Sequence, residues 1–115
     1  MAASSQRLAS EIGARILGSG GTAADACVAM DAALHVTEPT STGLGGDLFA
    51  LYYDAATRTV SALDASGRAP AALTLDVLSS APPLHDGRWV TVPGCCAGWA
   101  DLAERHGSMP LGELL

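Results

Sequence analysis

The segment from Ala23 to Val36 is apolar on nearly every face of a helix, and this feature constrains the fold more than any other. A helix with so little polar surface has to be surrounded by other elements. Thr22 is a good N-cap, and Asp25 three residues later gives a pattern close to a capping box. Glu38-Pro39 ends the segment, because the residue before proline disfavours the helical region. The sequence therefore predicts that this helix is buried against other elements.

The other elements are short helices and strands. Apolar spacing predicts a helix over Ser4–Leu17, which the glycines after it end. The apolar run Leu48–Tyr53 predicts a buried strand, and alternation predicts a second strand at Arg58–Asp64 that forms a hairpin with it. The remaining expected elements are a helical turn at Leu73–Leu78, a loop at Ser79–Gly87, a strand at Trp89–Val92 and helices at Gly98–Gly107 and Pro110–Leu115. The predicted fold class is α/β (α+β), with two N-terminal helices, then a β-hairpin and further helices.

Length and charge limit the possible partners. The 115 residues suit one domain, and six basic against twelve acidic residues give a net charge of −6. No basic run is present, so we expect no nucleic-acid partner. No uncharged apolar stretch reaches the roughly 18 residues of a membrane segment. Gln6, Arg7 and Glu11 stand where a signal peptide would need an apolar core, so the default expectation is a cytoplasmic chain.

Cysteine, histidine and glycine patterns predict no cofactor and no metal. The three cysteines are Cys27, Cys95 and Cys96, and the three histidines are His35, His85 and His106. An odd cysteine count argues against a disulfide framework, and adjacent cysteines lack zinc-knuckle spacing, so we expect small buried hydrophobes. The histidines are too far apart to bind one metal at helical spacing. Neither glycine cluster follows a strand and opens a helix, as phosphate-binding loops do.

Arg68 is the best polar candidate for a binding residue. It follows a predicted strand in a Gly-Arg-Ala-Pro turn and is one of only six basic residues. A guanidinium binds a carboxylate through two parallel hydrogen bonds. The alternative is an exposed, solvated arginine at the end of a strand, and the residues alone leave both possibilities open.

Several short motifs occur in a specific order along the chain. They are Ala9-Ser10-Glu11-Ile12-Gly13, Gly20-Gly21-Thr22-Ala23-Ala24-Asp25-Ala26, Glu38-Pro39, Gly43-Leu44-Gly45-Gly46-Asp47-Leu48-Phe49, Ala69-Pro70 and Val92-Pro93-Gly94. Together they resemble the N-terminal part of the large subunit in the γ-glutamyltranspeptidase (glutathione hydrolase) family. The resemblance covers nearly the whole chain, so residues 1–115 are expected to be an incomplete, N-terminal segment of such a domain.

The resemblance implies an N-terminal nucleophile hydrolase fold, an α/β/β/α sandwich of which this chain would hold a part. Family members are longer proenzymes that cleave themselves into a large and a small subunit. The new N-terminal Thr of the small subunit attacks a γ-glutamyl amide, with its own α-amino group as base. The implied partners are a small γ-glutamyl substrate and the remainder of the same proenzyme.

The chain departs from the family pattern in two places. The Thr-Thr-His-type nucleophile motif and the oxyanion glycine pair are absent, and Thr40-Ser41-Thr42 does not match, so we expect no catalytic residue in this chain. The family's Arg-Glu-x-Ala-Pro places the arginine that grips the substrate α-carboxylate at Ser66. Arg68 lies two residues further on the same face of an extended segment, about 6–7 Å away, and is the implied substrate-binding residue. This suggests a γ-glutamyltranspeptidase-like branch.

Two hypotheses follow for the function. The chain is the N-terminal part of an enzyme that hydrolyses or transfers the γ-glutamyl group of glutathione and related amides, or it is a non-catalytic truncated remnant or mis-bounded gene model of the same family. As 115 residues alone it is expected to be inactive. The nucleotide sequence downstream of the Leu115 codon separates the two hypotheses.

Overall fold

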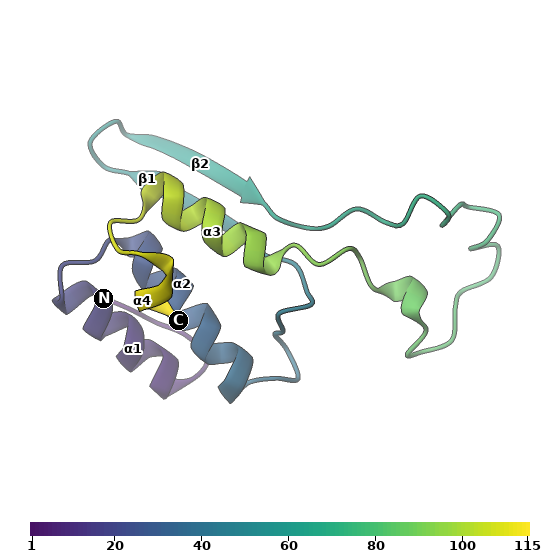
Figure 1. The fold of residues 1–115 in the computed structure, drawn as a ribbon, viewed down its shortest axis with the longest axis horizontal. Coiled ribbons are helices and arrows are strands. Elements are labelled where there is room, and N and C mark those ends of the chain that lie inside the picture. Colours follow the sequence, from purple (N-terminus) through teal and green to yellow (C-terminus); the bar gives the residue numbers. More distant parts are fainter.

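The fold, taken from a computed structural model that describes residues 1–115, is built of four α-helices and one β-hairpin. The elements are α1 (Arg7–Gly18), α2 (Ala23–Thr37), β1 (Phe49–Asp54), β2 (Thr59–Asp64), a 3₁₀ turn (Gly87–Trp89), α3 (Cys95–His106) and α4 (Leu111–Leu114). In Figure 1, α1 and α2 lie side by side, and α3 packs against both α2 and the hairpin. Residues 65–94 leave this body as a long excursion and return to α3. The predicted mixed α/β class and the order of its elements are confirmed.

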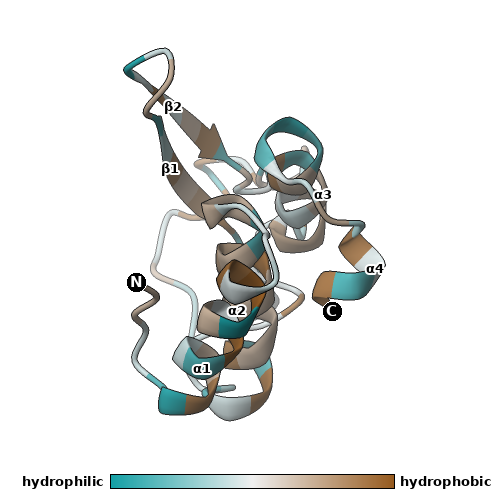
Figure 2. Ribbon diagram, turned by 90° about the vertical axis from the view of Figure 1, so that its left-hand side faces the viewer, coloured by the Kyte–Doolittle hydropathy of each residue, from teal (hydrophilic) through white to brown (hydrophobic).

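Helix α2 packs against α1, α3 and α4, in line with the burial that its apolar sequence predicts. Its N-terminus is a true capping box: the Asp25 amide donates to Thr22 Oγ1 (3.2 Å) and the Thr22 amide donates to Asp25 Oδ2 (2.7 Å). Figure 2 shows the hydrophobic colouring that runs along α2 and β1. The buried core joins α2 to α3 and α4 through Ala24, Val28, Ala29, Cys95, Trp99, Leu102 and Leu114.

A glycine of α1 lies in close contact with α2. A Cβ at Gly13 would collide with the side chain of Met30 on α2. The turn between the two helices also uses a glycine, since Gly20 has φ of +93°, a conformation that L residues with a side chain rarely adopt. These positions let two short helices approach closely enough for alanine-rich faces to pack.

The hairpin covers α3 with one face only. Its antiparallel register runs from Phe49 opposite Asp64 to Asp54 opposite Thr59. Ala50 and Tyr52 are half-buried, and the Tyr52 ring stacks on His106 of α3 with centroids 4.0 Å apart. On the other face Phe49, Leu51 and Tyr53 are 69%, 80% and 60% exposed. The sequence predicts a buried strand at Leu48–Tyr53. In the structure β1 is buried on one face only, because no element of this chain covers its outer face.

Two local expectations are wrong. Trp89–Val92 does not form a strand: Gly87–Trp89 is a 3₁₀ turn, and Val92 makes one backbone hydrogen bond, to the Arg68 carbonyl (3.2 Å). Apolar alternation makes a strand only where a second strand pairs with it. Helix α3 begins at Cys95 and not at Gly98, because the amides of Gly94 and Cys95 donate to the distant Gly46 carbonyl (3.1 and 3.0 Å).

No helix of this fold combines the length and the apolar character needed to cross a bilayer.

Candidate functional site

Two helices each bring a pair of residues, four positions apart, to one place in the core. Asp31 and His35 come from α2, and Cys95 and Trp99 come from α3. The Trp99 indole N–H donates to Asp31 Oδ2 (2.7 Å). Cys95 Sγ lies 3.8 Å from Asp31 Oδ2 and 3.9 Å from His35 Nε2, and these last two atoms are 3.8 Å apart. We call Asp31, His35 and Cys95 the α2–α3 cluster.

The α2–α3 cluster is mostly shielded from solvent. The His35 side chain is 8% exposed, and its Nδ1 is buried without a hydrogen-bond partner. Its ring packs against Trp99, with centroids 5.0 Å apart. Burial, followed by the nearby Asp31 carboxylate, raises the pKa of the Cys95 thiol to about 11. The thiol is therefore protonated at neutral pH and is not a thiolate nucleophile.

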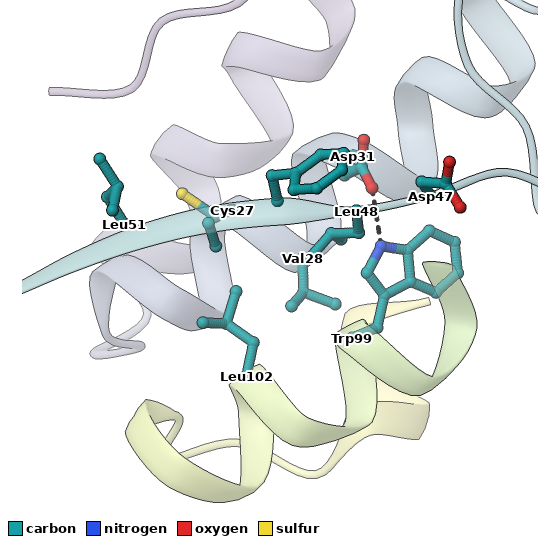
Figure 3. A pocket seen from close by; sticks show the side chains of 10 residues that line it. Cys27, Val28, Asp31, Asp47, Leu48, Leu51, Trp99 and Leu102 are labelled. Atoms are coloured by element: carbon teal, nitrogen blue, oxygen red, sulfur yellow. Dashed lines mark hydrogen bonds between the residues drawn. The ribbon is translucent and has the colours of Figure 1, made fainter. Parts of the chain in front are cut away.

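A cavity of about 390 Å³ adjoins the cluster, between α2, α3 and β1. It is mostly apolar, and Asp31 and Asp47 supply its carboxylates. Figure 3 shows the Trp99 indole directed at Asp31, with Asp47 beyond it and Cys27 and Leu51 toward the other end. The lining residues are Cys27, Val28, Asp31, Asp47, Leu48, Phe49, Ala50, Leu51, Trp99 and Leu102. A volume in this range suits a small ligand.

Asp47 ties the two ends of the excursion to the core. Its Oδ1 accepts hydrogen bonds from the Thr91 hydroxyl (2.8 Å) and the Gly67 amide (3.2 Å). The neighbouring Gly46 carbonyl caps α3, as described above. The glycine-rich loop at 43–46 therefore presents a carbonyl oxygen, a hydrogen-bond acceptor, to the start of α3. A phosphate-binding loop instead presents backbone N–H donors to its ligand.

Arg68 does not belong to the α2–α3 cluster and does not line the cavity. Exposure alternates along the segment after β2: Ser66 and Arg68 are exposed and Gly67 is half-buried. This alternation is that of an extended backbone, so Ser66 and Arg68 share a face. The Arg68 side chain makes no ion pair or hydrogen bond within the chain, and its role in substrate binding stays a prediction.

Sequence reasoning missed the α2–α3 cluster. The three histidines lack helical spacing to one another, but Asp31 and His35 have the i, i+4 spacing that places two side chains on one helical face. The expectation that all cysteines are buried is correct for Cys95 and wrong for Cys27 and Cys96, which are exposed. No local signal could have joined Cys95 to α2, since 64 residues separate it from Asp31.

Comparisons with known proteins agree with one another. A family model described as Gamma-glutamyltranspeptidase matches residues 9–115. The glutathione hydrolase proenzyme of Bacillus subtilis is 39% identical over 123 residues, covering 100% of this chain and 21% of that protein. The structure of Helicobacter pylori γ-glutamyltranspeptidase superposes with a TM-score of 0.88 at 37% identity, over 99% of this chain and 34% of that one. A cephalosporin acylase from Bacillus halodurans gives a TM-score of 0.87 at 41% identity, over 96% and 21%.

The chain thus spans about a fifth of the length of the curated relatives it matches. The family model covers all but the first eight residues, and the Bacillus subtilis and human relatives are named as glutathione hydrolase proenzymes. The chain therefore belongs to the γ-glutamyltranspeptidase family and corresponds to its N-terminal part.

Proposed function

We propose that this chain is the N-terminal segment of an enzyme that hydrolyses or transfers the γ-glutamyl group of glutathione and related amides. The observation that carries the proposal is the match to the family over residues 9–115, with the fold preserved at a TM-score of 0.88. The nucleophile and the oxyanion donors come from the rest of the polypeptide, because this chain has no residue that matches the family's nucleophile motif. The chain supplies the packed helices and the hairpin on which the site is built.

The outer face of the hairpin supports this role. Phe49, Leu51 and Tyr53 lie exposed in a row on β1, and Val60 on β2 is 65% exposed. A contiguous apolar sheet face is normally covered by another layer. We propose that the remainder of the same proenzyme covers it and thereby completes the α/β/β/α sandwich.

A second candidate function is hydrolysis of an amide whose acyl group is not γ-glutamyl. Two observations favour it: Ser66 stands where the family pattern has its carboxylate-binding arginine, and the cephalosporin acylase is 41% identical over 96% of the chain. Under the first proposal Arg68 replaces the missing arginine. Under the second, nothing near Ser66 needs to bind an α-carboxylate.

The experiment compares two anilides on the full-length protein. One carries a γ-glutamyl group and the other a butyryl group, which has the same chain without the α-amino and α-carboxylate groups. Faster release from the γ-glutamyl anilide supports the first function, and faster release from the butyryl anilide supports the second. The 115-residue chain expressed by itself should release neither above a heat-killed control, because nucleophile and oxyanion donors supply most of the rate. A full-length protein inactive on both would contradict both functions and favour a non-catalytic relative.

A further inference from the structure

We propose that Asp31, His35 and Cys95 form a zinc site between α2 and α3. One oxygen, one nitrogen and one sulfur converge there from two helices that pack inside the core. Neither the family match nor the proposed hydrolysis of amides requires such a site, so this inference goes beyond the proposed function.

The separations of the three atoms fit one metal ion. Asp31 Oδ2, His35 Nε2 and Cys95 Sγ form a nearly equilateral triangle with sides of 3.8, 3.8 and 3.9 Å. The point equidistant from the corners of such a triangle lies about 2.2 Å from each, and zinc binds oxygen and nitrogen at about 2.0–2.2 Å and sulfur at about 2.3 Å. The distance between the His35 nitrogen and the Asp31 oxygen is longer than a direct hydrogen bond.

The same geometry argues against a catalytic Cys-His-Asp relay. In a relay the imidazole contacts the nucleophile with one nitrogen and the carboxylate with the other. Here Cys95 and Asp31 both lie near His35 Nε2, while Nδ1 has no partner. Three groups that converge on one point are arranged as ligands.

The surroundings hold the three ligands in place. The Trp99 indole donates to the Asp31 oxygen of the cluster (2.7 Å), and its ring packs on His35. Hydrogen bonds and packing from outside the ligand set orient ligands in known metal sites. Asp31 and His35, at i and i+4, stay on one face of α2 whether or not an ion is bound.

The ligand types favour zinc over other ions. A sulfur and an imidazole nitrogen are poor ligands for Mg²⁺ and Ca²⁺, which take oxygen. Mixed sulfur, nitrogen and oxygen sets are typical of Zn²⁺, and three protein ligands leave a fourth position for water. Binding the ion transfers the Cys95 thiol proton to solvent, with no change of oxidation state.

Cobalt(II) provides the test, because a thiolate ligand gives it a near-ultraviolet charge-transfer band. The full-length protein is depleted of metal with a chelator and titrated with Co²⁺, and Zn²⁺ is then added to displace it. We expect the wild type to develop the band and to lose it to zinc. Cys95→Ser should abolish the band, and His35→Gln should weaken Co²⁺ binding more than about 100-fold, beyond the effect of losing a supporting contact. The matched control is Cys96→Ser, which changes the adjacent, exposed cysteine and should keep the band.

A second measurement does not depend on how the variants fold. X-ray absorption at the zinc edge of the wild type loaded with a single equivalent should show one sulfur among nitrogen and oxygen scatterers. Each of four results would overturn the proposal: no band in the wild type, a band that persists in Cys95→Ser, a band that is lost in Cys96→Ser, or a zinc shell without sulfur. These readouts are independent of amide hydrolysis, so either proposal can fail while the other stands.

Discussion

Asp25 in the first turn of α2 accepts two hydrogen bonds from Ser108, 83 residues later in the chain. The Ser108 amide and hydroxyl lie 3.0 and 2.9 Å from Asp25 Oδ2. Thr22 donates to the same oxygen from its amide (2.7 Å), and the Met109 amide approaches the other oxygen (3.4 Å). One fully buried carboxylate thus caps its own helix and anchors the segment between α3 and α4.

Replacing this carboxylate should destabilise the fold. Asp25→Asn keeps the shape of the side chain but turns an NH₂ donor or a weaker acceptor toward the N–H groups of Thr22 and Ser108. We expect a loss of about 2–3 kcal/mol in the free energy of unfolding, since buried donors then lack a partner. The measurement is chemical denaturation of the full-length protein followed by circular dichroism. Asp76→Asn, at an exposed position, is the control and should change stability little. Equal stability of the two variants would contradict the assigned role of Asp25.

The same carboxylate predicts how stability depends on pH. Burial alone would raise the pKa of Asp25, but hydrogen bonds from Thr22 and Ser108 outweigh it and lower the pKa below its ordinary value of 3.8. A lowered pKa in the folded state adds stability that is complete above pH 3.8 and is lost as the pH falls through the folded-state value. The stability difference between wild type and Asp25→Asn should therefore shrink below pH 3.8. A difference that stays constant down to the acid transition would show that the charge of Asp25 is not involved.

Arg68 provides a test of substrate recognition in the full-length protein. If it binds a substrate carboxylate, Arg68→Ala should cost about 1.5–3 kcal/mol, or roughly 10–150-fold in kcat/KM, mainly through KM. Arg68→Lys should recover only part of this, because an ammonium lacks the planar fork of a guanidinium. Steady-state kinetics on a γ-glutamyl substrate and on its α-carboxamide analogue provide the measurement.

The analogue and a second arginine serve as controls. Wild type should discriminate between acid and amide, and Arg68→Ala should not. Arg58→Ala, in the exposed hairpin turn, should behave as wild type. Wild-type kinetics in both Arg68 variants would make this residue a solvated arginine at the end of a strand, and carboxylate recognition would then lie elsewhere.

The 115-residue chain expressed by itself should self-associate. The outer face of β1, with Phe49, Leu51 and Tyr53, has no cover within the chain, and the two-stranded sheet has open edges. Light scattering should detect oligomers or aggregates, and Leu51→Lys should reduce them because it places a charge in the exposed apolar row of β1. Val92→Lys, at an exposed position away from the hairpin, is the matched control. A soluble wild-type monomer with cooperative thermal unfolding and sharp near-ultraviolet dichroism would refute this prediction.

Local sequence signals determined where most of the helices and strands of this protein lie. The capping box at Thr22 and Asp25, the glycine stop after α1 and the alternation in the hairpin each act within a few residues, and the structure has α1, α2, β1 and β2 within a few residues of where they were expected. The ordered motifs also indicated the family, because each motif encodes a turn, cap or close contact that the fold needs. Helical and strand periodicity can be recognised without knowing what packs against the element.

Tertiary structure alone decided three features. The early start of α3 depends on hydrogen bonds to the distant Gly46 carbonyl. The exposure of one face of β1 depends on which layers pack against the hairpin. The α2–α3 cluster depends on contacts of Asp31 with Cys95, 64 residues away, and with Trp99, 68 residues away. Propensity and periodicity describe how a residue relates to its near neighbours along the chain. They contain no information about which distant side chain will fill the adjoining space, since that depends on how whole helices pack against each other.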